Sequence, residues 1–265
     1  RPFLAKGGRV AIVVVTPLAT LVENVLAEMA DTAVTHQEST ANHTVFHYHF
    51  TAEPTTEPQP AFSEGLYWRD QLPVTYRKLN FTMQTAHGLP EFDTLSFATR
   101  LLFNLLNDLP LKQIEHLLVI NPGQGHTAVA AWLSLHPQQI TLVDRDLLAL
   151  QTTAYNLQQN GCPAGRLRSY HQSGLPSFPT PIDLVLHPLR DSEGPRLAVA
   201  RLHLLAEQIS SKATLLVAAN SHLISQVEQQ LRKDGRLKPH KRKKRKGFSA
   251  LWLHLSSPAQ TSPKT

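Results

Sequence analysis

Short, continuous apolar runs alternate along this chain with segments in which apolar residues recur at helical spacing. Near the middle, each of two such runs is followed by a helical segment, and a glycine-rich turn at 121–125 follows the first run. The predicted strands are 117–120 and 140–143, and the predicted helices are 127–135 and 147–159, the second closed by Asn160-Gly161. This order of elements is typical of one half of a nucleotide-binding unit.

The same alternation continues on both sides of this unit. Upstream, a leucine-rich helix between Leu95 and Leu106 is expected to begin at a cap formed by Asp93 or Thr94, after a short strand at 79–83. Downstream, the predicted elements are strands 182–186 and 214–219 and helix 195–209. Alternating strands and helices predict an α/β fold built on a parallel sheet.

The end of the chain repeats the pattern of its beginning. A strand, a helix and two strands are predicted within 9–50, and the same order returns about 204 residues later. The first set is strand 9–15, helix 18–29 and strands 31–38 and 43–50; the second is strand 213–220, helix 223–231 and strands 236–241 and 248–255. A repeat of this length predicts duplicated domains, with a chance match of a common arrangement as the alternative.

A stretch with three prolines in ten residues, 51–60, separates the first set from the rest of the chain and predicts a stiff linker. We therefore expect residues 1–50 to be the C-terminal remnant of a first domain and 51–61 to be the linker. Residues 62–257 then form a complete domain, and 258–265 a disordered tail. The chain lacks an initiator Met, so we expect it to begin inside a larger product.

Composition narrows the class of protein. The apolar share of 42% is sufficient for a globular core, and no apolar run of about 18 residues predicts a membrane span. The single cysteine, Cys162, cannot form an internal disulfide, which fits a cytoplasmic location. The 14 histidines show no zinc-ligand spacing, so no metal site is expected.

The positive charge is concentrated near the C-terminus. Ten of the 26 Lys and Arg, but one of the 20 Asp and Glu, lie in 231–246, so the remainder holds 16 basic and 19 acidic residues. Six consecutive cations are predicted to lie in the loop between the last two strands and to bind RNA phosphates: Lys241, Arg242, Lys243, Lys244, Arg245 and Lys246. A solvated hairpin is the alternative.

Three residues of the central unit are candidates for binding a cofactor. Gly123 and Gly125 would let a ligand approach the backbone at the start of a helix. Asp144 follows the next strand, where a carboxylate can accept hydrogen bonds from both hydroxyls of a ribose. The alternative is that Asp144 or Asp146 caps the following helix.

The flanks of this unit resemble a known family. TAHGLPEFDTLSFATRLLF (85–103), LLVAANSHL (215–223) and KGFSALW (246–252) are similar to motifs of the bacterial ribosomal RNA guanine-N2 methyltransferases. Those enzymes carry two tandem class I methyltransferase domains, of which the second binds S-adenosylmethionine. The resemblance implies a Rossmann-like seven-stranded sheet at 62–257, preceded by a partial copy of the same fold.

The polar motif positions depart from that family. Gly123, Gly125 and Asp144 match, but Val119 stands where an Asp is expected, and the acid expected near the adenine is missing around Ser173. The family's NPPF motif is replaced, without gaps, by Pro188, Leu189, Arg190 and Asp191. With a shift of one residue, His187 and Pro188 would take the place of Asn-Pro, and His187 has a pKa range suited to a general base.

The resemblance implies a methyltransferase that uses S-adenosylmethionine and acts on a guanine N2 of ribosomal RNA. His187 and Pro188 would face the target, and Gly123, Gly125 and Asp144 would bind the cofactor. Two alternatives stay open: an inactive methyltransferase fold that binds RNA through its basic run, and a methyltransferase of small molecules.

Overall fold

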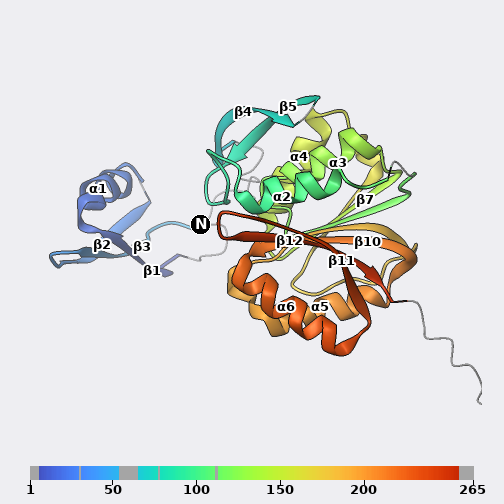
Figure 1. Ribbon diagram of the computed structural model, residues 1–265. Helices are drawn as coiled ribbons and strands as arrows, with labels where there is room; N and C mark the ends of the chain where they lie inside the picture. Colours follow the sequence, from blue (N-terminus) through green and yellow to red (C-terminus); the bar gives the residue numbers. More distant parts are fainter. Residues whose placement is uncertain (1–5, 30, 54–64, 77, 111–112, 257–265) are drawn as a thin grey trace, which may run out of the picture. The chain divides into compact units, whose positions relative to one another are not determined.

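The computed structural model describes residues 6–29, 31–53, 65–76, 78–110 and 113–256 (Figure 1). The chain divides into two compact units, Arg1–Glu64 and Gly65–Thr265. Most of the predicted linker and the predicted tail lie outside the described residues.

Unit 2 is built on a seven-stranded sheet with the order β11-β12-β10-β9-β6-β7-β8. The five strands from β10 to β8 in this order are parallel, β12 is antiparallel to β10, and β11 is antiparallel to β12. The parallel strands are β6 (His116–Ile120), β7 (Gln139–Asp144), β8 (Leu167–His171), β9 (Ile182–Pro188) and β10 (Ile209–Asn220), and the closing hairpin is β11 (Leu237–Arg245) and β12 (Phe248–Leu255). The strand order reverses between β6 and β9, where doubly wound sheets bind their ligands.

Helices cover both faces of this sheet (Figure 1). One face is covered by α2 (Phe97–Leu106), α3 (His126–Leu135) and α4 (Leu147–Gln159), and the other by α5 (Gly194–Ala206) and α6 (Ser221–Asp234). Because strand side chains alternate, Leu184 and Leu186 of β9 join the core under α2, α3 and α4, whereas Val185 joins the core under α5 and α6. This two-sided burial explains why the parallel strands are continuous apolar runs.

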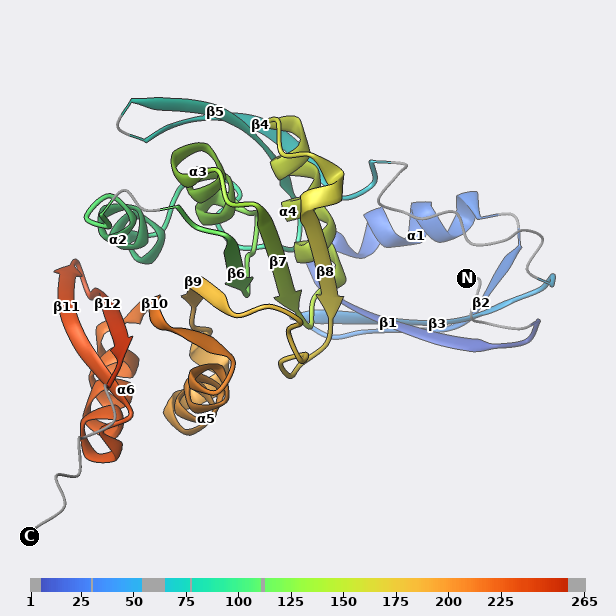
Figure 2. The same ribbon diagram turned by 90° about the vertical axis from the view of Figure 1, so that its right-hand side faces the viewer.

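A separate hairpin, β4 (Trp68–Tyr76) and β5 (Leu79–Ala86), lies outside α3 and α4 (Figure 2). Asn156 of α4 holds it by accepting a hydrogen bond from the backbone N–H of Gln84, at 2.8 Å, and donating one to the Gln84 carbonyl, also at 2.8 Å. The hairpin therefore forms one wall above the helical layer.

The predicted fold class is confirmed: unit 2 has the Rossmann-like sheet of the class I methyltransferases. Several details of the prediction were wrong. Strands β4 and β8 were not predicted, because their polar and apolar residues are mixed. The helix predicted at 195–209 ends at Ala206, and Ile209 begins β10. The cap of α2 is Ser96, whose side chain accepts the backbone N–H of Thr99 at 3.1 Å.

The described part of unit 1 contains a three-stranded antiparallel sheet and one α-helix. Its elements are β1 (Arg9–Val15), α1 (Ala19–Glu28), β2 (Thr32–Ser39) and β3 (His43–Phe50), with strand order β1-β3-β2. The core is small: Leu26, Phe46, Tyr48 and Phe50 are buried, while Val13 and Leu21 are more than half exposed.

The strand pairing of unit 1 matches that of the C-terminal part of unit 2. The order β1-β3-β2 corresponds to β10-β12-β11, with antiparallel pairs throughout. The register of β2 shifts between Val34 and His36, and that of β11 shifts between Pro239 and Lys241. The two shifts lie 205 residues apart in the sequence (239 − 34). This correspondence agrees with the predicted repeat, while the origin of unit 1 as a domain remnant stays a prediction.

Candidate functional site

The glycine turn lies between β6 and α3. Gly123 has φ +59° and Gly125 has φ +94°, both in the left-handed region that favours glycine. A Cβ atom at Gly125 would lie 3.1 Å from the Cα atom of Thr153 in α4, whereas one at Gly123 would meet only Pro90, at 4.0 Å. Gly125 is therefore needed to pack the turn against α4, and Gly123 is the glycine that leaves space for a ligand.

A hollow of about 390 Å³ lies beside this turn, at the carboxyl ends of β6, β9 and β10. Its volume is within the range of about 300–1,000 Å³ that is common for ligand pockets. Residues that line it include Glu91, Gly123, His126, Asp146, Pro188 and Asn220. The hollow therefore occupies the position in which this type of sheet binds a ligand.

Asp144, the third predicted cofactor residue, has an internal partner. Its side chain is fully buried at the end of β7, and both carboxylate oxygens accept hydrogen bonds from Nη2 of Arg190, at 2.7 and 2.9 Å. One oxygen also accepts the backbone N–H of Asp146 at 2.9 Å. Burial raises the pKa of Asp144, and the Asp146 hydrogen bond and the charge of Arg190 only partly offset this effect. The oxygens predicted to bind a ribose thus already accept hydrogen bonds within the protein, and the Asp144 side chain has no exposed surface.

A smaller hollow of about 130 Å³ lies against Asp144 and extends to Ser173, after β8. Several of its charged groups are also paired within the protein. Arg201 of α5 donates hydrogen bonds to the Glu193 carboxylate at 2.9 and 3.0 Å and to the Ser173 carbonyl at 3.2 Å. This region, where the resemblance implies an adenine, is therefore small, and the buried charges of Glu193 and Arg201 are paired with each other.

The alternative that an acid caps the helix after β7 is realised by Asp146. Its Oδ1 atom accepts the backbone N–H groups of Leu148 and Ala149, at 3.0 and 3.4 Å. Asp144 accepts a hydrogen bond from the Asp146 backbone N–H and so helps to hold this capping residue in place.

The structure corrects the expectation that His187 faces a target. This side chain is fully buried on β9 and does not line the hollow. Burial, reinforced by the positive charge of Arg201, lowers the pKa of His187 to about 3. A neutral ring without access to the hollow cannot act as the base for a substrate bound there. Pro188 does line the hollow, but its carbonyl accepts a hydrogen bond from Nδ2 of Asn121 at 3.1 Å.

The basic run is not a loop, which is a further correction. Residues 241–245 belong to β11, and only Lys246 and Gly247 form the turn to β12. Lys241 and Lys243 form ion pairs with Asp108, at 2.9 and 2.5 Å, because alternate side chains of β11 face the end of α2.

The remaining four cations of the run differ in whether they have an acidic partner. Arg242 forms an ion pair with Glu228 of α6 at 2.7 Å. In the part of the chain that the structure describes, Lys244, Arg245 and Lys246 are exposed and have no carboxylate partner. Half of the predicted RNA-binding residues are therefore free of competing acids.

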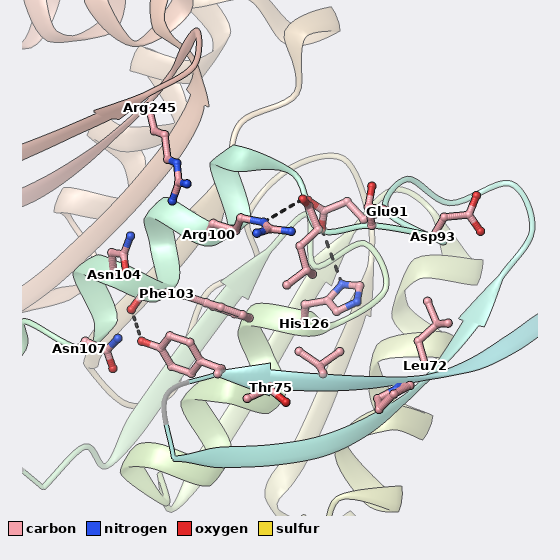
Figure 3. Close-up of a pocket in the computed structure, with 15 residues that line it drawn as sticks. Leu72, Thr75, Glu91, Asp93, Arg100, Phe103, Asn104, Asn107, His126 and Arg245 are labelled. Carbon is pink, nitrogen blue, oxygen red and sulfur yellow. Dashed lines mark hydrogen bonds and ion pairs between the residues drawn. The ribbon is translucent and has the colours of Figure 1, made fainter.

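A second hollow, of about 520 Å³, opens between β4 and α2 (Figure 3). It shares Glu91 and His126 with the first hollow. Nδ1 of His126 lies 3.6 Å from the Glu91 carboxylate, and burial lowers the pKa of His126 while the Glu91 charge acts in the opposite direction. Arg100 and Arg245 line this hollow from α2 and β11.

Sequence reasoning did not identify Arg190, Glu91 or His126 as parts of one site. Arg190 was noted only as a departure from a family motif. The signal that could have identified Arg190 is an arginine just after one parallel strand and an aspartate at the end of another, since such ends meet at one edge of the sheet.

Among the described residues, no group of three His, Cys, Asp or Glu side chains is arranged to hold a metal ion. No helix of the described segments is long and apolar enough to cross a membrane.

No model of a protein family matches the sequence, and no curated protein sequence matches it. Solved structures do show similarity of fold. The 16S rRNA N2 methyltransferase of T. thermophilus, in complex with S-adenosylmethionine and guanosine, is 15% identical, with a TM-score of 0.64 over 95% of this chain and 66% of that chain. The ribosomal protein L11 methylase of Lactobacillus delbrueckii subsp. bulgaricus is 14% identical, with a TM-score of 0.53 over 60% of this chain and 79% of that chain.

These similarities define unit 2 as a class I methyltransferase fold. At this level of identity they establish the fold alone. What the chain binds therefore has to be argued from its own residues.

Proposed function

We propose that this protein is an RNA-binding protein with a methyltransferase fold in which Arg190 closes the cofactor site. The observation that carries this proposal is the ion pair between Arg190 and the buried Asp144. Asp144 is the one predicted polar cofactor ligand that remains, and both of its oxygens already accept hydrogen bonds from Arg190. In this arrangement the residues do not fit S-adenosylmethionine.

The predicted target side of the site supports the same conclusion. Transfer of a methyl group to an exocyclic amine depends on acceptors that orient the amine, because positioning and electrostatics supply the catalysis. The Pro188 carbonyl, which could be such an acceptor, is bonded to Asn121, and His187 is buried elsewhere. Of the groups that would position the target, one is therefore hydrogen-bonded within the protein and the other is buried away from the hollow.

RNA binding is supported by the charges that remain free. Lys244, Arg245 and Lys246 are exposed at the tip of the β11–β12 hairpin, without acidic partners in the described residues. Clustered cations of this kind bind phosphates with little sequence preference. The similarity to an enzyme of 16S rRNA makes RNA the polyanion that we favour.

A second candidate function is an active methyltransferase that uses S-adenosylmethionine and acts on a guanine N2 of ribosomal RNA. It is favoured by the hollow of about 390 Å³ at the point where the strand order reverses. This function requires Arg190 to leave Asp144, and the Arg190 side chain is 26% exposed, so it has a route toward solvent.

Two measurements separate these functions. Isothermal titration with S-adenosylmethionine up to millimolar concentration should show no binding, and labelled cofactor should transfer no methyl group to ribosomal RNA. Fluorescence anisotropy with RNA should show binding that weakens in the variant Lys244→Ala/Arg245→Ala/Lys246→Ala. Cofactor binding together with methyl transfer by the unaltered protein would establish the second function instead; absence of RNA binding would remove the first.

A further inference from the structure

Three cations surround the ring of Phe97 at the beginning of α2. The guanidinium carbon of Arg245 lies 5.5 Å from the ring centroid, Nζ of Lys246 lies at 5.7 Å and the guanidinium carbon of Arg100 at 6.0 Å. Two of them come from the β11–β12 hairpin and the third from α2. We refer to Arg100, Arg245 and Lys246 as the Phe97 cluster.

The positive charge of the Phe97 cluster is not neutralised within the protein. None of its three members has a carboxylate partner among the described residues, in contrast to Lys241, which is paired with Asp108. Arg100 donates one hydrogen bond, from Nε to a backbone carbonyl at 3.3 Å, and this leaves its two terminal nitrogens available. Cations this close together repel one another, and an anion bound between them would remove that repulsion.

The Phe97 cluster lies at the edge of the second hollow. Arg100 and Arg245 both line the hollow, and Figure 3 shows Arg245 reaching from β11 toward α2 and Arg100. The hollow has a volume of about 520 Å³, which is adequate for a nucleoside. Leu72 on β4 and Asn104 on α2 line its walls.

The acids that face this hollow are already paired. Asp93 forms an ion pair with Arg69 at 2.6 Å. Glu91 accepts hydrogen bonds from the Ser96 backbone N–H at 2.9 Å and from the Thr99 hydroxyl at 2.7 Å. The charge of Asp93 is thus offset by Arg69. Glu91, whose partners are neutral, is outnumbered by Arg100 and Arg245, so the lining keeps a net positive charge, which favours an anionic ligand.

We propose that the Phe97 cluster binds a phosphate of single-stranded RNA and that the adjoining nucleoside enters the hollow between β4 and α2. This inference rests on the RNA binding proposed above and adds a residue from α2 and a nucleotide pocket to it. The RNA has to be unpaired, because only an unstacked base can turn away from its neighbours and enter a pocket. Phosphate contact supplies affinity, and the hollow selects unpaired RNA over duplex.

The test is the salt dependence of binding to a labelled RNA of about 12 unstructured nucleotides, a length within the range of single-strand sites. Each phosphate contact contributes about 0.7 to the slope of log K against log salt for single strands. Arg100 and Arg245 contact the same phosphate, so Arg100→Ala/Arg245→Ala should reduce the slope by about 0.7. The charge-matched control Lys212→Ala/Lys233→Ala removes two exposed cations elsewhere and should leave the slope unchanged.

A second variant tests the hollow without altering charge. Leu72 lines the hollow and lies on the same face of β4 as the buried Val74 and Tyr76, so Leu72→Trp should fill the hollow, and a large aromatic residue suits a strand. We expect several-fold weaker RNA binding at an unchanged slope, whereas Leu72→Met, which conserves volume, should bind like the unaltered protein. Circular dichroism melting checks that each variant is folded, and Arg100→Lys/Arg245→Lys should restore the slope.

The outcomes are distinct. If the unaltered protein binds RNA but Arg100→Ala/Arg245→Ala keeps the full slope, the cluster is not the phosphate site, while the RNA-binding function stands. If the slope falls but Leu72→Trp binds normally, the nucleoside does not enter the hollow and that part of the proposal is wrong. If the unaltered protein binds no RNA, the proposed function itself fails.

Discussion

Removal of Arg190 is the most informative perturbation of the candidate site. Arg190→Ala would leave the fully buried carboxylate of Asp144 with one hydrogen bond, from the Asp146 backbone. Breaking a buried ion pair typically costs about 3–5 kcal/mol, because the remaining charge is left without a partner. The Arg190 side chain is 26% exposed, and solvent screens part of this interaction, so we expect a loss of about 2–3 kcal/mol.

Thermal unfolding provides the measurement. For a unit of this size, 1 kcal/mol corresponds to about 2–4 °C in Tm, so Arg190→Ala should lower Tm by roughly 4–12 °C. Arg196→Ala removes an exposed arginine of α5 that forms no ion pair with the described residues, so it is the matched control and should change Tm little. Asp144→Asn combined with Arg190→Ala should recover much of the loss, since no buried charge remains.

The effect should depend on pH in a defined direction. The pKa of Asp144 is raised by burial, so the folded state favours its neutral form more than the unfolded chain does. The destabilisation in Arg190→Ala is therefore full above the folded-state pKa of Asp144 and diminishes as pH falls through it. A variant that is as stable as the Arg196→Ala control at neutral pH would refute the reasoning.

Four further predictions concern other parts of the molecule. Gly125→Ala should destabilise the protein by about 2–4 kcal/mol in urea unfolding, since it combines left-handed strain with a close backbone contact. Gly161→Ala has left-handed strain but faces open space, so it should cost only about 1–2 kcal/mol. Equal losses in the two variants would contradict this reasoning. Burial raises the pKa of Cys162 to about 11, so the native thiol should resist a disulfide reagent at pH 8 and react once unfolded. His187, with a pKa of about 3, should stay neutral from pH 8 to pH 5 in nitrogen NMR spectra of the imidazole, and a titration in that interval would show that the ring is accessible. Asp108→Asn should cost up to about 1.5 kcal/mol at pH 7, and this difference should vanish as pH falls through the lowered pKa of Asp108.

The sign of the Asp108 prediction follows from its surroundings. Desolvation alone would raise the pKa of Asp108, but the hydrogen bonds and charges of Lys243 and Lys241 outweigh it and lower the pKa. The stabilising effect of the carboxylate is thus present at neutral pH and lost on acidification. Asp108→Asn also frees two lysines of β11, so RNA binding should become tighter in the same variant.

The parallel strands and their helices could be predicted from the sequence because each is determined by local pattern. Continuous apolar runs such as Leu117–Ile120 are required wherever both faces of a strand are buried, and a leucine stripe is required where one helix face is buried. The glycines of the turn were also predictable, since few other residues adopt positive φ. Strands β4 and β8 were missed because their partly exposed faces give no clear alternation.

The sequence by itself thus determined the α/β class, the order of the elements and the position of the glycine turn. Only the tertiary structure decided the state of the site. Arg190 and Asp144 are 46 residues apart and meet because β7 and β9 end at the same edge of the sheet. Likewise, the six consecutive cations cannot be told apart by sequence. In the structure, the alternation of side chains along β11 directs Lys241 and Lys243 toward Asp108 and Arg242 toward Glu228, and the other three cations lie at the hairpin tip. Charge pairing across a fold depends on distances between elements, and these are absent from any local pattern.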